Sequence, residues 1–226
     1  MSPAFHTCTS RAASMLALLL TLAVPLPAGA QLNNWTRHAG VWSFDSLGDI
    51  QQTAQDPASS TGFWGTPANI LQRNQLVLGD FSISASMGTA VGSNNGWNAV
   101  GFAFRIQDPQ NFYRVHFFPG YGGGALRFEK YVNGRLVFIQ PDAHVGFTPQ
   151  QGAFYRLRLE ASGSTFTARL SDPSGAYPDF TLTYTDTTFA SGGVGLSNDI
   201  GPGFFRNVYL DQPACGPQAR GWTKPS

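Results

Sequence analysis

Residues 101–140 read GFAFRIQDPQNFYRVHFFPGYGGGALRFEKYVNGRLVFIQ, which is four short segments of alternating apolar and polar residues. Turn signals separate the segments: DPQN at 108–111, PGYGGG at 119–124 and NG at 133–134. Alternation between such turns is typical of half-buried antiparallel strands. The stretch therefore predicts an antiparallel meander.

Each turn in this stretch sets a register between neighbouring strands. The expected cross-strand pairs are Arg105 with Arg114, Val115 with Phe128, His116 with Arg127, and Glu129 with Phe138. A slip of one residue would exchange the two faces of a strand, and the three registers agree on the faces. This agreement makes the meander the best-supported part of the prediction.

The two predicted faces differ sharply in polarity. The apolar face collects Phe102, Phe104, Ile106, Tyr113, Val115, Phe117, Leu126, Phe128, Val137 and Ile139. The polar face collects Arg105, Gln107, Arg114, His116, Arg127, Glu129 and Tyr131. We expect the apolar face to line the core of the domain.

Residues 1–30 have the features of a secretory signal peptide. Arg11 precedes an apolar run from Met15 to Leu26, and Ala28-Gly29-Ala30 supplies the small residues that signal peptidase reads. The run is too short to cross a bilayer, and no later stretch could do so. We expect cleavage before Gln31 and a soluble protein that is secreted or periplasmic; the alternative is a cytosolic protein with an apolar N-terminus.

The chain after residue 30 is formally neutral. Fourteen Lys and Arg less Arg11 leave thirteen, which equals the thirteen Asp and Glu, all of them after residue 30. Nucleic acids and anionic membranes need a concentrated positive field, so neither is expected as a partner. Cys8 lies in the predicted signal peptide, which leaves Cys215 alone and excludes a disulfide within one mature chain.

The remaining segments predict an all-β domain. Strands are expected at 40–44, 69–78, 80–87, 155–161, 166–172, 180–184, 192–197 and 204–210. Residues 48–65 and 88–98 read as loops, and no convincing helix follows residue 30. Many short strands with glycine and proline between them indicate a two-sheet antiparallel sandwich or jelly roll. The domain should span 31–211, followed by a loose tail at 212–226.

Several motifs carry a resemblance to a known family. They are Phe104–Asp108, Asn111–Arg114, Leu126–Lys130, Val132–Gly134, Tyr155–Glu160 and Gly192–Leu196. Together they resemble the laminin-G-like, concanavalin A-like lectin and glucanase jelly rolls of bacterial secreted proteins, over residues 40–211. The resemblance implies two antiparallel sheets face to face, one of them concave. Such modules commonly bind carbohydrate or act in adhesion, often with a structural calcium ion, and some relatives hydrolyse glycosides.

Catalytic signals are weak in this chain. Glycoside hydrolysis needs two carboxyl groups beside the bond, and glucanases of this fold carry them as E-x-D-x-x-E on one strand. The chain has only Glu129 and Glu160, neither in such a motif, and most of its Asp residues lie in turns. There is no H-E-x-x-H zinc motif and no G-x-S-x-G elbow.

The polar face of the meander is the candidate ligand site. Sugars are recognised by planar or charged groups that match vicinal hydroxyls, beside an aromatic ring on which a sugar can rest. The predicted ligand-binding residues are Arg105, Arg114, His116, Arg127, Glu129, Tyr131 and Trp97. Trp64 is a second loop aromatic, and either Trp could instead fold back on the core. The simpler interpretation is a solvated outer face whose charged pairs contribute little to stability.

A calcium site is a separate hypothesis. Related sandwich domains hold the ion between an early acidic residue and one near the last strand, and Asp45 and Asp211 occupy such places. No other cofactor is expected. We therefore expect an exported, non-catalytic module that binds an extracellular glycan or glycoconjugate. The alternatives are a glycoside-acting hydrolase of the same fold and a structural or adhesive domain that binds other proteins.

Overall fold

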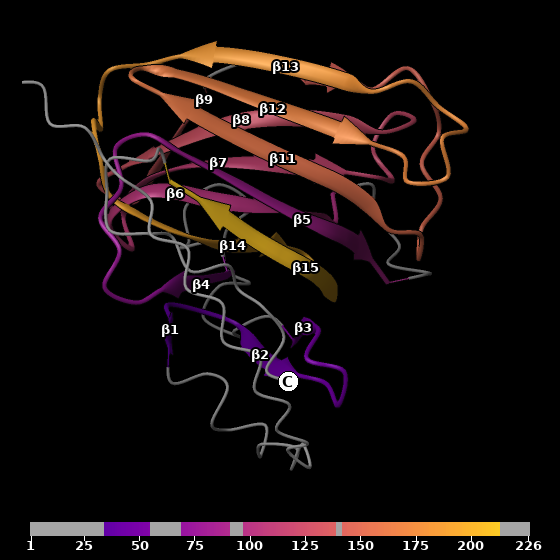
Figure 1. The fold of residues 1–226 in the computed structure, drawn as a ribbon, viewed down its shortest axis with the longest axis horizontal. Helices are drawn as coiled ribbons and strands as arrows, with labels where there is room; N and C mark the ends of the chain where they lie inside the picture. The colour runs from indigo at the N-terminus through magenta and orange to yellow at the C-terminus, as the bar shows by residue number, and fades with distance from the viewer. Residues whose placement is uncertain (1–33, 55–68, 91–96, 139–141, 213–226) are drawn as a thin grey trace, which may run out of the picture.

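The computed structural model describes residues 34–54, 69–90, 97–138 and 142–212, which form two antiparallel sheets and no α-helix (Figure 1). Sheet A contains, in spatial order, β1 (Trp35–Arg37), β4 (Asn69–Arg73), β14 (Gly193–Asp199), β6 (Ala99–Asp108), β7 (Asn111–Phe118), β8 (Ala125–Val132) and β10 (Ala143–His144), with β9 (Arg135–Phe138) also paired to β8. Sheet B contains β13 (Phe180–Thr185), β12 (Thr165–Ser171), β11 (Tyr155–Ser162), β5 (Phe81–Thr89), β15 (Gly203–Asp211), β3 (Ile50–Ala54) and β2 (Val41–Phe44). The predicted all-β jelly-roll sandwich is confirmed.

The two sheets lie face to face, with sheet B toward the viewer and sheet A behind it in Figure 1. Their inner faces form one apolar core. The Phe104 ring of β6 lies 5.0 Å from the Phe166 ring of β12 and 6.4 Å from the Phe81 ring of β5, between centroids. Burying each such ring stabilises the fold by roughly 1.5–3 kcal/mol. No helix in the described part of the chain is long and apolar enough to cross a membrane.

Most of the predicted strands are present, but β1, β3 and the two-residue strand β10 were not predicted. β3 lies inside the predicted loop 48–65. In β3 the side chains of Ile50 and Gln52 face the core. Because Gln52 is polar although it is buried, the sequence of β3 lacks the alternation of apolar and polar residues that predicts a strand. The predicted signal peptide, Trp64, Cys215 and the tail after Gln212 lie outside the described residues.

Two of the three predicted meander registers are confirmed. Between β7 and β8, Val115 pairs with Phe128 and His116 pairs with Arg127. Between β8 and β9, Glu129 pairs with Phe138. The turn chemistry of these two hairpins was therefore sufficient to set the register.

The register predicted between β6 and β7 is wrong because β6 contains a bulge. Asp108 pairs with Asn111 as the turn requires, but Arg114 lies opposite Ala103, not Arg105. Arg105 has a positive φ of 49°, a conformation that costs a non-glycine residue of order 1 kcal/mol or more. The bulge turns Arg105 toward the core and places Ile106 on the opposite face, in a cluster with Ala103.

Of two further residues of the predicted apolar face, one is exposed and the other lies outside the described residues. Val137 pairs with Lys130 on the short strand β9, and its side chain is exposed. Ile139 lies outside the described residues. The other inward-facing residues of the meander belong to the main core, as predicted.

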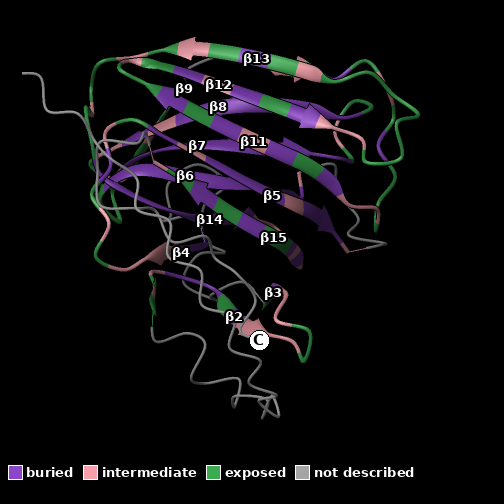
Figure 2. Cartoon of the chain, in the orientation of Figure 1, coloured by how far each residue is buried: buried purple, intermediate pink, exposed green. Residues whose placement is uncertain are grey.

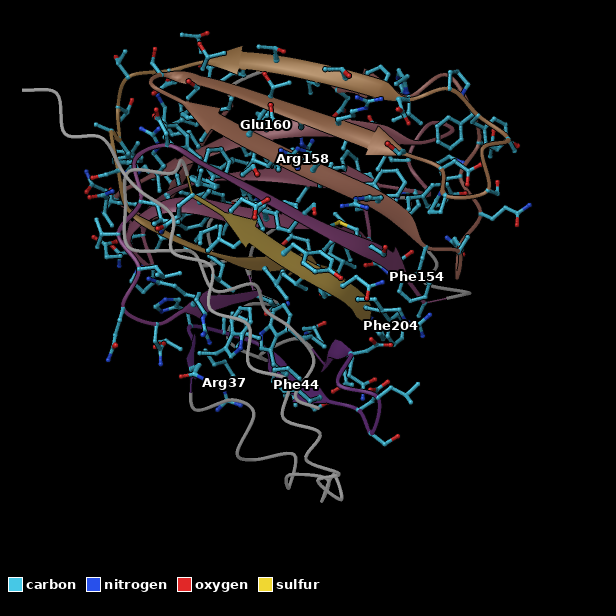
Figure 3. All side chains as sticks on the ribbon, viewed as in Figure 1. Arg37, Phe44, Phe154, Arg158, Glu160 and Phe204 are labelled. Atoms are coloured by element: carbon cyan, nitrogen blue, oxygen red, sulfur yellow. The ribbon has the colours of Figure 1, made fainter. Side chains whose placement is uncertain are left out.

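The outer faces of the two sheets differ. Figure 2 shows buried residues along nearly the whole of β6, β7 and β8, so the outer face of sheet A is buried as well as its inner face. β11 of sheet B instead alternates between buried residues and residues that are exposed or half-buried. Arg158 and Glu160, labelled in Figure 3, form an exposed ion pair of 2.7 Å on that outer face. A solvated outer face is therefore found on sheet B and not on the meander.

Candidate ligand-binding site on sheet A

The outer face of sheet A has a floor of small residues on β6. Ala99, Gly101 and Ala103 lie there between β14 and β7. Because these residues have little or no side chain, long side chains of β7 can lie flat across β6 and reach β14. His116 does so: its Nε2 lies 2.9 Å from the Ser197 hydroxyl oxygen of β14.

Five charged side chains form one row across this face, which we call the charged row. In spatial order they are Asp199 of β14, Arg114 of β7, Glu129 and Arg127 of β8, and Asp142 just before β10. Acidic and basic groups alternate along the row. Each Arg therefore lies between two carboxylates, which offsets the repulsion expected when basic residues share one face of a sheet.

Arg114 is the best-connected member of the charged row. Nη2 of Arg114 lies 2.6 Å from Oδ2 of Asp199, and Nη1 lies 3.1 Å from Oδ1. These two contacts have the bidentate geometry of a strong charge-assisted pair. Nε of Arg114 donates to Oε2 of Glu129. Burial alone would lower the pKa of Arg114, but the charges of Asp199 and Glu129 outweigh burial and raise it. Arg114 is therefore held charged and in one orientation.

Glu129 joins the two halves of the charged row. It is fully buried, and its second oxygen, Oε1, lies 2.7 Å from Nε of Arg127. Nη1 of Arg127 in turn lies 3.2 Å from Oδ1 of Asp142. A buried carboxylate is tolerated only when it is paired and hydrogen-bonded. Glu129 accepts a hydrogen bond from Arg114 and is ion-paired with both guanidinium groups.

Burial also controls the protonation of the groups next to the row. The pKa of His116 lies well below its ordinary value because the ring is fully buried and the charges of Arg114 and Arg127 are close. Burial raises the pKa of Asp199, an effect that Arg114 opposes and Glu129 reinforces. Because its pKa is lowered, the His116 imidazole is neutral at physiological pH.

Aromatic rings pack against both Arg side chains of the row. The Tyr131 and Phe112 rings stack 4.6 Å apart, and the Arg114 guanidinium lies 5.0 Å from the Tyr131 ring centroid. The Arg127 guanidinium lies 4.4 Å from the Phe118 ring and 5.8 Å from the Trp97 ring. Planar guanidinium groups stack well on aromatic faces, so these rings fix the Arg side chains.

Trp97 belongs to an aromatic cluster with Phe118, Tyr121 and His144. The Trp97 and Tyr121 rings lie 4.4 Å apart, and the Tyr121 ring is nearly parallel to that of His144 at 6.4 Å. Tyr121 stands in the glycine loop between β7 and β8, where Gly122, Gly123 and Gly124 all have positive φ. Trp97 thus packs beside the charged row and is only partly buried.

The structure brings together most of the residues that the sequence singled out. Arg114, His116, Arg127, Glu129 and Tyr131 share one face, and Trp97 lies beside Arg127. Sequence reasoning missed Asp142, Ser197, Asp199 and Tyr121. Asp199 ends a strand whose outward residues are otherwise glycine and serine, so its sequence neighbours carry no sign of a site.

Arg105 and Gln107 do not belong to this site, contrary to the prediction. The Arg105 guanidinium donates to the carbonyl oxygens of Phe189 at 2.9 Å, Gly79 at 3.1 Å and Gly163 at 2.7 Å, and also to Ala190. Gln107 donates to the carbonyl oxygens of Arg105 and Ser191. Both side chains join loops at one end of the sandwich, because the bulge in β6 turns this segment out of the regular alternation.

The geometry does not bring the two carboxylates of the calcium hypothesis together. Oδ1 of Asp45 accepts the N–H groups of Leu47 and Asp49 in the turn between β2 and β3. Phe205 of β15 pairs with Ile50 at that turn, and Asp211 follows Phe205 by six residues. Six residues of strand span about 20 Å, so Asp211 is far from Asp45. Within the described residues, no group of three His, Cys, Asp or Glu side chains is placed to hold a metal ion. Calcium binding stays a prediction without an assigned site.

Comparison with solved structures finds a similar fold in several proteins. The carbohydrate-binding module CBM66 from Bacillus subtilis is similar with a TM-score of 0.61 and 21% identity, over 79% of this chain and 96% of that one. A Bacillus subtilis protein of unknown function with a galectin-like fold is similar with a TM-score of 0.50 and 10% identity, over 82% of this chain and 92% of that one.

A larger enzyme also contains a similar unit. Xylan beta-1,4-xylosidase from Bacillus halodurans C-125 matches with a TM-score of 0.54 and 10% identity, over 76% of this chain but only 34% of the enzyme. No protein-family model and no curated protein sequence matches the chain. At these identities the similarity establishes the fold, an antiparallel jelly roll, and leaves the ligand to be argued from the site.

Proposed function

We propose that this chain is an exported, non-catalytic module that binds carbohydrate on the outer face of sheet A. The observation that carries the proposal is the charged row, whose Arg side chains are each held between two carboxylates and which ends in two partly exposed Asp side chains. A site whose side chains are held in one orientation before binding loses less conformational entropy when the ligand arrives.

The chemistry of the face suits a polyhydroxyl ligand. Carboxylates accept hydrogen bonds from neighbouring hydroxyls, and Arg114 and Arg127 hold those carboxylates in fixed positions. The partly buried ring of Trp97 beside Arg127 offers a surface on which a sugar ring can rest. Charged groups and an aromatic surface thus lie side by side, as sugar recognition requires.

The structural comparisons support the same function. The chain matches almost the entire length of CBM66, which is described as a carbohydrate-binding module, so the likeness extends to a whole binding module. In the xylosidase it matches a third of the chain. A unit of this fold is thus found both as a carbohydrate-binding module and as part of a larger enzyme.

The surroundings of Glu129 weigh against hydrolysis as the alternative. One of its oxygens accepts from Arg114 and the other lies against Arg127, so neither is positioned to deliver a proton to a glycosidic oxygen. A hydrolase also needs a second carboxyl group at a defined distance on the other side of the bond. The adhesive, protein-binding alternative has no comparable observation in its favour.

A glycan array probed with protein produced from the full-length chain tests this proposal. We expect binding to at least one class of plant, bacterial or storage glycan, followed by a Kd from calorimetry. Trp97→Ala should weaken that Kd about tenfold, since an aromatic contact contributes about 1 kcal/mol or slightly more. The matched control is Tyr177→Ala, which removes an exposed ring stacked on Phe147 in a loop of sheet B.

The outcomes separate the alternatives. Absence of binding across all glycan classes would overturn the proposal. Release of reducing sugar from a bound polysaccharide would favour a hydrolase. Equal loss of affinity in both aromatic variants would place the ligand elsewhere than the outer face of sheet A.

A further inference from the structure

The middle of the charged row is buried, and only its two acidic ends are partly exposed. The side chains of Arg114 and Arg127 are each 4% exposed and that of Glu129 is 0% exposed. The side chains at the two ends, Asp199 and Asp142, are 26% and 20% exposed. A ligand that approaches this face therefore meets carboxylates first and finds the guanidinium groups behind them.

The basic groups of the row are already bound to carboxylates. Arg114 uses Nε for Glu129 and both terminal nitrogens for Asp199, so a ligand carboxylate could bind it in bidentate fashion only by displacing Asp199. Arg127 is ion-paired with Glu129 through Nε and with Asp142 through Nη1. Two Arg and three carboxylates give the row a formal charge of −1.

The nearby histidine adds no positive charge for an anion. His116 is buried beneath this face, and burial together with the two Arg charges lowers its pKa well below the ordinary value. His144, in the aromatic cluster, stacks on Tyr121. The side chains of the charged row that a ligand meets are thus carboxylates, beside aromatic rings.

We propose that this site selects neutral glycans and rejects acidic ones, and that the carboxylates of Asp142 and Asp199 are the residues that determine this specificity. The inference rests on the proposed function, since it concerns the ligand of the same site. Neutral hydroxyls donate to both carboxylates, which cannot themselves donate when ionised. A uronate, sialate or sulfate group would instead face two like charges, and like-charge contacts are an effective means of excluding a wrong ligand.

The test compares one glycan in a neutral and an acidic form. The neutral polysaccharide that gives the strongest array signal is partly carboxymethylated, and calorimetry gives Kd for both forms with the full-length protein. We expect at least a roughly tenfold preference for the neutral form. The preference should narrow as salt rises from low to high concentration, because added ions screen charges near the surface.

Two Asp variants distinguish charge from steric exclusion. Asp142→Asn, alone and together with Asp199→Asn, keeps the shape of the site while it changes the row from −1 to 0 and then to +1. The ratio of Kd for the acidic form to Kd for the neutral form should fall toward one in the single variant. In the double variant it should fall further. Asp179→Asn is the control, since Asp179 pairs with Arg169 on sheet B and the same chemical change there should leave the ratio unaltered.

Failure of this inference differs from failure of the proposed function. If acidic glycans bind as tightly as neutral ones in a manner that Trp97→Ala weakens, the site binds glycans but lacks this selectivity. A preference that survives in both Asn variants would likewise overturn the role of Asp142 and Asp199. If no glycan of either kind binds, the proposed function and this inference are both wrong.

Discussion

Gly101 of β6 lies directly under the His116 ring of β7. A Cβ atom at position 101 would lie 2.9 Å from Cδ2 of His116 and 1.8 Å from the carbonyl oxygen of Val115. The backbone of Gly101 is not in the left-handed region, so only space, and not conformation, requires glycine there. The close approach lets His116 reach across β6 to Ser197 of β14.

Gly101→Ala should therefore be severely destabilising. The new methyl group cannot fit unless the β6 and β7 backbones separate, and we expect a loss of about 3 kcal/mol in the free energy of unfolding, the upper end for overpacking. Urea denaturation measures the loss. Gly79→Ala is the control, because a Cβ there meets nothing within 4 Å. Equal stability of the two variants would show that β6 and β7 can relax at no cost.

Arg105→Lys tests the assignment of Arg105 to the fold and not to the ligand site. Lysine keeps the charge but cannot reach the carbonyl oxygens on both sides of the guanidinium, and hydrogen bonds to charged groups contribute about 1.5–3 kcal/mol each. We expect a fall of about 2 kcal/mol in the free energy of unfolding, measured by urea denaturation, with glycan affinity unchanged. Arg158→Lys on the exposed face of sheet B should change neither quantity. Weakened glycan binding at unchanged stability would return Arg105 to the site.

Glu129→Gln tests whether the charged row stabilises the fold. The side chain keeps its size but loses the charge that two buried guanidinium groups share, and breaking a buried ion pair costs about 3–5 kcal/mol. The comparison is with Glu160→Gln, the other Glu of the chain, whose side chain is exposed. We expect a large drop in melting temperature for the first variant and almost none for the second. Similar melting temperatures would mean that the row contributes no net stability.

Asp186 anchors the loop after β13 and should give the fold a defined acid sensitivity. It accepts hydrogen bonds from Tyr113 and from Lys130, the latter at 2.6 Å. Burial alone would raise the pKa of Asp186, but the hydrogen bonds from Lys130, Thr188 and Tyr113 outweigh burial and hold it well below its ordinary value of 3.8. The unfolded chain therefore takes up a proton here at a higher pH than the folded protein does.

The sign of the pH dependence follows from this shift. The stabilisation by Asp186 is fully present above about pH 4 and is lost as pH falls through the lower pKa of the folded state. Asp186→Asn should lower the free energy of unfolding at pH 7 by about 1.5–3 kcal/mol and flatten its dependence on pH below about 4. Urea denaturation across a pH series measures both effects, with exposed Asp211→Asn as control. A pH dependence identical to that of the unchanged protein would contradict the anchoring role.

The hairpins and their faces could be predicted because their information is local. The turns at 119–124 and 133–134 set the registers of β7 with β8 and of β8 with β9, and the alternation of each strand then assigns its faces. For this reason the sequence alone predicts that Arg114, Glu129, His116 and Arg127 share one face. The strand β3 was missed because a buried glutamine interrupts its apolar pattern.

The bulge at Arg105 could not be read from the sequence in the same way. A regular β6 would satisfy the turn at 108–111, and the bulge is favoured only because carbonyl oxygens from three distant segments surround the Arg105 guanidinium. Those contacts span 26 to 84 residues along the chain. The local periodicity of the sequence does not predict such partners.

The sequence by itself determined an all-β jelly roll, the registers of two hairpins and a cluster of charged residues on one face of the meander. Tertiary structure decided what those residues do. It brought Asp199 to Arg114 across 85 residues and Asp142 to Arg127, and it buried the face between them. The physical reason is that turn chemistry and side-chain alternation act between neighbours in the chain, whereas burial, charge pairing and the exposed ends of the row depend on which strands become neighbours in space.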